Sequence, residues 1–206
     1  MADKITSMTR PTLKEEKKLW RKGYKRVAGI DEVGRGPLAG PVVACAVIIG
    51  RSDLHYIKDS KQLSAKQREE IYSILTKHPD IEWGIGLVSE KIIDKINILE
   101  ATKLAMQKAV SKLKEPDFLI LDGNFSIKSD IPQKSIIKAD EKVFSCSCAS
   151  IIAKVTRDRL MIKYDKKYPC YGFASNKGYP TKYHRAMLNK YGRCGIHRDS
   201  FHYGST

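Results

Sequence analysis

Residues 27–41 read VAGIDEVGRGPLAGP, and this stretch determines more of the fold than any other part of the chain. Residues 27–30 are apolar and partly β-branched, which predicts a strand buried on both faces of a sheet. We expect the strand to end at Asp31 and Glu32, because ionised groups in its interior would carry a large desolvation cost. The glycines and prolines that follow predict a sharp turn. Acids at the carboxyl end of a central strand lie where open α/β sheets bind their ligands.

The chain has 206 residues and is strongly basic, with 38 Lys and Arg against 23 Asp and Glu and a formal net charge of +15. This excess favours a polyanionic partner, and nucleic acid is the usual one because binding releases counterions. No basic amphipathic helix with a bulky aromatic face stands out, so we prefer nucleic acid to a membrane surface. Residues 1–18 are polar, and the longest apolar run, residues 42–49, is only as long as a strand. The sequence therefore predicts a cytoplasmic protein without a membrane segment.

Apolar runs and capping signals predict the order β-β-α-β-α-β-β-α, preceded by a short charged helix at residues 12–22. Strands are expected at residues 25–31, 42–49, 81–88, 118–121 and 135–137. Helices are expected at residues 64–78, 97–115, 143–167 and 181–190. The first three strands would form an antiparallel half-sheet. The predicted class is α/β, a mixed five-stranded sheet with helices on both faces.

Four acids lie at the ends or edges of apolar runs: Asp31, Glu32, Asp122 and Asp140. The strands that carry Asp31 and Asp122 can lie side by side in parallel, which would bring these acids together. Carboxylates that converge with no arginine among them repel one another, and a hard divalent cation such as Mg²⁺ or Mn²⁺ removes that repulsion. Two such ions about 3.5–4 Å apart can clamp the attacking and leaving oxygens of a phosphodiester. Each acid taken alone could merely cap a turn, but the set beside a basic surplus favours a metal site.

Gly34, Arg35 and Gly36 follow the paired acids directly. Glycine lets a backbone approach a ligand closely, its amides can bind a phosphate or a sugar hydroxyl, and arginine adds a planar phosphate donor. The triplet alone is more often a plain turn. Beside the acids it predicts a sugar–phosphate contact.

Basic residues gather in the C-terminal third, around Tyr179. They could hold a duplex across its minor groove, although a solvated helix face is the alternative for any one of them. Lys61 could reach a substrate phosphate or could simply be solvated. His197 and His202 are expected to be surface or packing residues, and Cys146 and Cys148 small buried residues of a helix.

These motifs together resemble bacterial ribonuclease HII, the type 2 branch of the ribonuclease H superfamily. The resemblance begins with the motif at residues 31–42 and spans about residues 27–201 in order. It continues through residues 59–64, 97–106, 121–123, 138–140, 149–161, 171–173, 177–184 and 196–201. Ala139 stands where the family usually has glycine, Asn176 where it usually has histidine, and Cys146 and Cys148 where it has alanine-like residues.

The resemblance implies a ribonuclease H-like fold and a metal-dependent endonuclease that uses Mg²⁺ or Mn²⁺. The implied metal-binding and catalytic residues are Asp31, Glu32, Asp122 and Asp140. The implied substrate contacts are Gly34, Arg35, Gly36, Lys61, Lys177 and Tyr179. Among these, the glycine–arginine–glycine triplet would contact the ribose 2′-hydroxyl, and the tyrosine would stack under the next sugar.

The implied reaction is cleavage on the 5′ side of ribonucleotides in duplex DNA, and of the RNA strand in RNA–DNA hybrids, leaving 3′-hydroxyl and 5′-phosphate ends. It would serve ribonucleotide removal in replication and repair. We expect one domain over residues 1–206, with an N-terminal helical segment at residues 1–24 and a C-terminal substrate-binding region at about residues 168–206.

Two alternatives stay open. The first is a type HIII ribonuclease H, which carries an additional amino-terminal domain, whereas 26 residues precede Val27 here. The second is a basic nucleic-acid-binding protein without catalysis, which four acids at strand ends disfavour. A monomer is the expected state, and the sequence indicates no protein partner.

Overall fold

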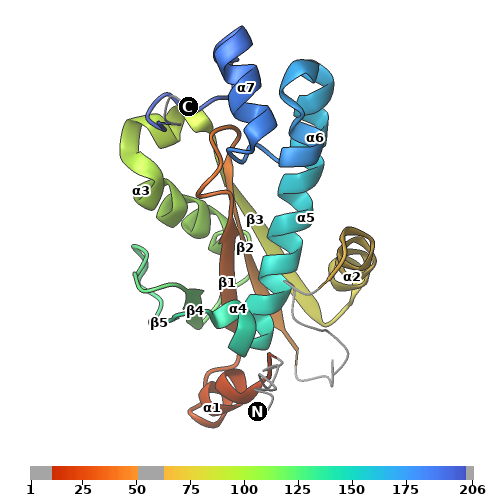
Figure 1. Cartoon of the computed structure of the whole chain (residues 1–206). Coiled ribbons are helices and arrows are strands. Elements are labelled where there is room, and N and C mark those ends of the chain that lie inside the picture. The colour runs from red at the N-terminus through yellow and green to blue at the C-terminus, as the bar shows by residue number, and fades with distance from the viewer. Residues whose placement is uncertain (1–10, 51–62, 203–206) are drawn as a thin grey trace, which may run out of the picture.

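The computed structural model describes residues 11–50 and 63–202, which fold around a mixed five-stranded sheet (Figure 1). The strand order is β3-β2-β1-β4-β5. Strands β3, β2 and β1 pair antiparallel, whereas β1, β4 and β5 pair in parallel. The strands are β1 Val27–Val33, β2 Val42–Ile49, β3 Ile81–Val88, β4 Phe118–Asp122 and β5 Gln133–Ile136. The predicted α/β class and mixed sheet are confirmed.

Helices cover both faces of this sheet (Figure 1). They are α1 Lys14–Arg21, α2 Ala65–Lys77, α3 Glu90–Val110, α4 Ala139–Lys142, α5 Phe144–Lys167, α6 Phe173–Asn176 and α7 Lys182–Tyr191, with a 3-10 turn at Pro169–Tyr171. Helix α3 lies on one face and α2 and α5 on the other, and α1 lies at the end of the sheet opposite α6 and α7. None of the helices in the described part combines the length and apolar character that crossing a membrane requires.

Strand β2 shows why both faces need a helical cover, because all eight of its residues are buried. Its side chains alternate: Val42 and Ala44 belong to the core under α3, and Val43 and Cys45 to the core under α5 and α2. A continuous apolar run rather than an alternating one is typical of a strand buried on both sides. The prediction from residues 42–49 is confirmed.

Helix α2 begins where its capping signal predicts. The N–H of Gln67 donates to Ser64 Oγ at 3.2 Å, and the Ser64 N–H donates to Gln67 Oε1 at 2.8 Å. This reciprocal capping box satisfies two donors that the first helical turn leaves open. Helix α7 begins similarly, with the His184 N–H bonded to Thr181 Oγ1 at 3.2 Å.

The expectation that the first strand ends at its acids is wrong, because β1 continues to Val33. The two edges of β1 differ. Pairing with β4 stops at Ile30 opposite Leu121, whereas pairing with β2 continues through Asp31 opposite Cys45 as far as Val33. Asp31 is therefore inside the strand, one residue beyond the last pair with β4, and its side chain projects from a face of the sheet.

Helix α3 also differs from its prediction, because it begins at Glu90 and ends at Val110, before Pro116. Asn97 interrupts it with φ 64° and ψ 168°. The Asn97 Oδ1 accepts the N–H groups of Leu99 and Glu100 at 2.9 and 3.2 Å. The capping signal at Asn97 was correct, but it starts the second of two merged helical segments.

The C-terminal region packs on the turn that follows β1. The Leu38 N–H donates to the Gly178 carbonyl and the Gly40 N–H to the Ile196 carbonyl, both at 2.8 Å. A separate apolar cluster, which includes Leu38, Met161, Phe173 and Ile196, fills the space between turn and helices. The glycine-rich turn is thereby held between two distant segments of the chain.

Candidate active site

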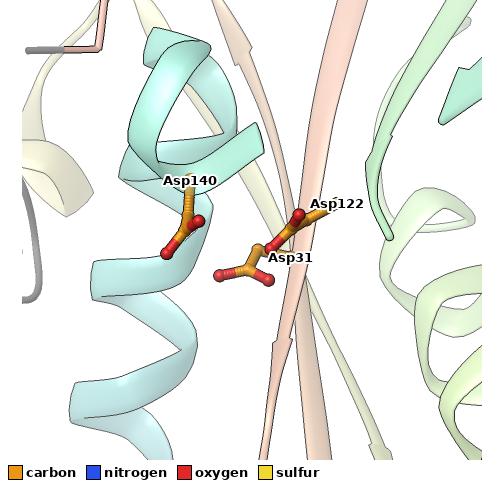
Figure 2. Close-up of side chains that lie close together, drawn as sticks. All are labelled: Asp31, Asp122 and Asp140. Atoms are coloured by element: carbon orange, nitrogen blue, oxygen red, sulfur yellow. The ribbon is translucent and has the colours of Figure 1, made fainter. Parts of the chain in front are cut away.

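Three carboxylates from three elements converge at one point (Figure 2). Asp31 comes from β1, Asp122 from the end of β4 and Asp140 from α4. One oxygen of each lies within 4.8 Å of the others. Asp31 and Asp140 are buried, and Asp122 is partly exposed. The parallel pairing of β1 with β4, as predicted, brings the first two together, and the short helix α4 carries the third to them.

Backbone and hydroxyl donors orient these acids. The Ala139 N–H donates to Asp122 Oδ1 and the Glu32 N–H to Asp31 Oδ1, each at 2.8 Å. The Ser150 hydroxyl on α5 also bonds to Asp31 and lowers its pKa. Ala139 thus contributes only its backbone to the site, which is why a methyl group is tolerated at this position.

Glu32 lies beside the three aspartates rather than among them. Its Oε1 is 3.3 Å from Arg35 Nη1. Its Oε2 is buried and has no hydrogen-bond partner among the described residues. Arg35 thus pairs with Glu32. Burial raises the pKa of Glu32 to about 7, although the Arg35 cation opposes the rise.

Burial also raises the pKa of Asp31 well above its usual range, and the charges of Glu32 and Asp122 raise it further. Ionised carboxylates this close in a poorly solvated place repel one another strongly. A hard divalent cation relieves that repulsion and prefers oxygen donors, so the side chains present here fit Mg²⁺ or Mn²⁺. The buried Oε2 of Glu32 has no hydrogen-bond partner among the described residues and is one more oxygen that could serve as a metal ligand.

The glycine–arginine–glycine turn and Tyr179 lie face to face. A Cβ placed on Gly36 would lie 3.8 Å from the Tyr179 ring, whose residue is 39% exposed. Gly34 has φ +95°, and a Cβ there would lie 2.3 Å from the Arg157 Nε. Only glycine fits that position, since both the backbone conformation and the space exclude a side chain.

The two predicted substrate lysines differ in what the structure shows. Lys177 is on the Tyr179 loop with φ 52°, and its ammonium donates to the Ala174 carbonyl within that loop. Its own carbonyl accepts a bond from Arg157 at 2.9 Å. Lys61 lies outside the described residues.

The sequence prediction missed two fully buried arginines, Arg157 and Arg198, which are 0% and 1% exposed. Both bind backbone carbonyls of the glycine-rich turn. Arginine is mostly a surface residue, so nothing in a single sequence marks these two as buried. Asp158, which follows Arg157 on α5, forms a local ion pair with Lys154 at 2.8 Å.

His184 and His197 are a buried pair, which confirms the packing role predicted for His197. Their Nε2 atoms lie 3.0 Å apart. The His184 Nδ1 lies 2.9 Å from the Tyr179 carbonyl, which can only accept, so this nitrogen carries the proton. The Cys194 N–H donates to the His197 Nδ1 at 2.8 Å. The His197 Nε2 must then donate to His184, so both rings are neutral.

Comparisons with known proteins agree with this site. The sequence model of the family described as Ribonuclease HII matches residues 28–203. A ribonuclease HII from Acetivibrio thermocellus is 53% identical over 188 residues, covering 90% of this chain and 73% of the relative. One from Acholeplasma laidlawii is 50% identical over 196 residues, covering 94% and 96%.

A solved structure of a PCNA:RNase HII complex from Archaeoglobus fulgidus contains a similar chain, with a TM-score of 0.76 and 27% identity. The match covers 88% of this chain and 97% of that one. The sequence match runs through the three converging acids, the glycine-rich turn and the C-terminal region that packs on it. The chain therefore belongs to the ribonuclease HII family and is a ribonuclease H, an endonuclease that acts on nucleic acid.

Proposed function

We propose that this enzyme hydrolyses the phosphodiester on the 5′ side of a ribonucleotide in duplex DNA, and also cuts the RNA strand of RNA–DNA hybrids. The products would carry 3′-hydroxyl and 5′-phosphate ends. The observation that carries the proposal is the convergence of Asp31, Asp122 and Asp140 within 4.8 Å, on the strand that leads into the glycine–arginine–glycine turn. Neither feature alone would select this reaction.

The metal-binding residues in this proposal are Asp31, Asp122 and Asp140, with Glu32 as a further donor. Mg²⁺ or Mn²⁺ bound there would supply a nucleophilic water at neutral pH and stabilisation of the leaving oxygen. The protein's part is to hold the carboxylates in place through the Ala139 and Glu32 N–H groups. Arg35 binds one carboxylate oxygen of Glu32, and the other is buried without a hydrogen-bond partner among the described residues.

Substrate recognition in this proposal belongs to Gly34, Arg35, Gly36 and Tyr179. A 2′-hydroxyl distinguishes a ribonucleotide from a deoxyribonucleotide, so the contact that reads it must lie within hydrogen-bonding reach of the sugar. Gly36 lies next to the Tyr179 ring, so a sugar bound by the turn would also lie beside that ring. Lys177 and Lys61 stay proposals as phosphate contacts of the C-terminal region and of the segment before α2.

The same proposal describes the whole chain as one catalytic domain that acts as a monomer, with its C-terminal region, from about residue 168, against the duplex. Its role would be removal of ribonucleotides from DNA. The family match favours type HII over type HIII. The converging carboxylates disfavour a protein that only binds nucleic acid.

The test is a labelled DNA duplex with one ribonucleotide beside an all-DNA control, incubated with Mg²⁺, Mn²⁺ or EDTA. We expect cleavage only in the presence of a metal, only 5′ of the ribonucleotide, with the end groups stated above. Binding without cleavage in every metal condition would contradict the catalytic proposal. Equal cleavage of both duplexes would contradict 2′-hydroxyl recognition.

A further inference from the structure

Arg198 is buried with a charge that the nearby acids Asp94 and Glu90 offset only in part. Its exposed fraction is 1%, and it has no ion pair with a carboxylate in the described part of the chain. Burial, and then the nearby Arg157 cation, lower the pKa of Arg198 to about 9, so it stays protonated at neutral pH. A buried, unpaired cation is costly unless its donors are satisfied. What satisfies it here is the backbone of the turn after β1.

The Arg198 guanidinium binds both ends of that turn. Its Nη1 donates to the Arg35 carbonyl at 2.9 Å and its Nη2 to the Gly34 carbonyl at 2.5 Å. Its Nε and Nη2 donate to the Gly40 carbonyl at 3.0 and 2.8 Å. The Phe201 ring packs against the guanidinium, with its centroid 4.9 Å from Cζ. Only a planar fork with several donors can make these bonds at once.

These bonds fix the orientation of two peptide groups. In a trans peptide the carbonyl and the N–H point in opposite directions. Since the Gly34 and Arg35 carbonyls point at the guanidinium, the Arg35 and Gly36 N–H groups point away from it. No described residue accepts a hydrogen bond from either N–H. Two oriented donors are therefore left available on the turn, beside Tyr179.

We infer that Arg198 is a positioning residue that sets the selectivity of this enzyme for a ribonucleotide. By holding the two carbonyls, it directs the Arg35 and Gly36 N–H groups at the sugar 2′-oxygen. The inference rests on the proposed function and deepens it: the 2′-hydroxyl is read by backbone donors whose direction a side chain more than 160 residues away determines.

Arg157 offers a matched control. It is buried to the same degree, and its guanidinium also donates to three carbonyls: those of Ala39, Pro41 and Lys177. It therefore ties the far end of the turn to the Tyr179 loop, but it binds neither carbonyl within the glycine–arginine–glycine triplet. Loss of Arg157 should loosen the region without rotating the two peptide groups.

The experiment compares R198K and R157K with the parent on two duplexes that differ at one sugar, a ribonucleotide or its 2′-fluoro-2′-deoxy analogue. The selectivity is the ratio of kcat/KM for the two, measured on one preparation, so it does not depend on the folded fraction. Where the analogue is cut too slowly, the ratio of dissociation constants in EDTA replaces it. Melting temperatures record the stability of each variant.

We expect R198K to lower the selectivity at least about tenfold, equivalent to ~1.4 kcal/mol. R157K should lower both rates together and leave the selectivity within about twofold of the parent. R198Q, which keeps an amide donor without the charge, should behave as R198K does.

Equal losses on both duplexes in R198K would overturn the inference and leave Arg198 a structural residue. Absence of any activity from both R198K and R198Q would overturn it in the same way. If the parent itself does not discriminate between the duplexes, the proposed 2′-hydroxyl recognition fails, which is a different result.

Discussion

At the scale of single residues, the site consists of acids that the protein crowds together against their mutual repulsion. Burial, more than any neighbouring charge, raises the pKa of Asp31. In the metal-free protein this carboxylate is therefore a source of instability as well as a proposed ligand. Activity and stability should respond in opposite directions when its charge is removed.

We accordingly predict that D31N lowers metal-dependent cleavage at least about 100-fold, because an amide is a poor replacement for a carboxylate ligand. In EDTA the same variant should melt at a higher temperature than the parent, because one buried negative charge is gone. D158N serves as the control, since Asp158 only pairs with Lys154 on α5. Parent-like cleavage by D31N would remove Asp31 from the catalytic set.

At the scale of elements, side-chain capping occurs inside a helix as well as at the ends of helices. Asn97 holds a left-handed conformation between the two segments of α3 and caps the second through Leu99 and Glu100. Helix α3 covers a whole face of the sheet, so this one residue sets the direction in which the cover runs.

Replacing Asn97 should therefore cost stability in two separable parts. We predict that N97A lowers the free energy of unfolding by about 1–2 kcal/mol, because it loses the cap and keeps a Cβ at positive φ without the local hydrogen bonds by which asparagine offsets that conformation. N97G loses the cap but accepts the conformation, so it should cost less. Urea unfolding of the three proteins measures the difference. An N97G variant less stable than N97A would show that the backbone conformation contributes nothing.

At the scale of the whole molecule, the neutral His184–His197 pair joins the Tyr179 loop to the C-terminal segment. Burial lowers the pKa of both rings, and for His197, with the further effect of His184, the value is about 4. An unfolded histidine titrates near 6.5. The folded pKa values are the lower ones, so acid favours the unfolded form.

The expected pH dependence follows from that sign. The contribution of the pair to stability is complete above about pH 6.5 and is lost as the pH falls toward the folded pKa of about 4. We predict a falling melting temperature over this interval, with faster amide exchange around Tyr179. H197N, whose amide oxygen can accept the Cys194 N–H, should flatten the dependence. An unchanged pH profile in H197N would mean that other groups control acid stability.

Much of the fold was predictable because it depends on neighbours in sequence. The continuous apolar run of β2, the capping box before α2 and the turn after β1 are local patterns, and local forces produce them. The convergence of Asp31 with Asp122 followed from one further rule, that parallel strands align their carboxyl ends. The same local rules failed at the end of β1, where the two edges of one strand stop at different residues.

The sequence by itself thus determined the strands, their order along the chain and the acids that converge at the proposed metal site, because hydrophobic periodicity and turn chemistry act over a few residues. The tertiary structure alone decided that Glu32 pairs with Arg35, that His197 donates a hydrogen bond to His184, and that Arg198 reaches Gly34 and Arg35. A guanidinium can bond to a distant backbone carbonyl only after the chain has folded. Every residue has such a carbonyl, so the residue types in the sequence do not mark which ones are bound. Long-range contacts to the backbone therefore leave no pattern in a single sequence.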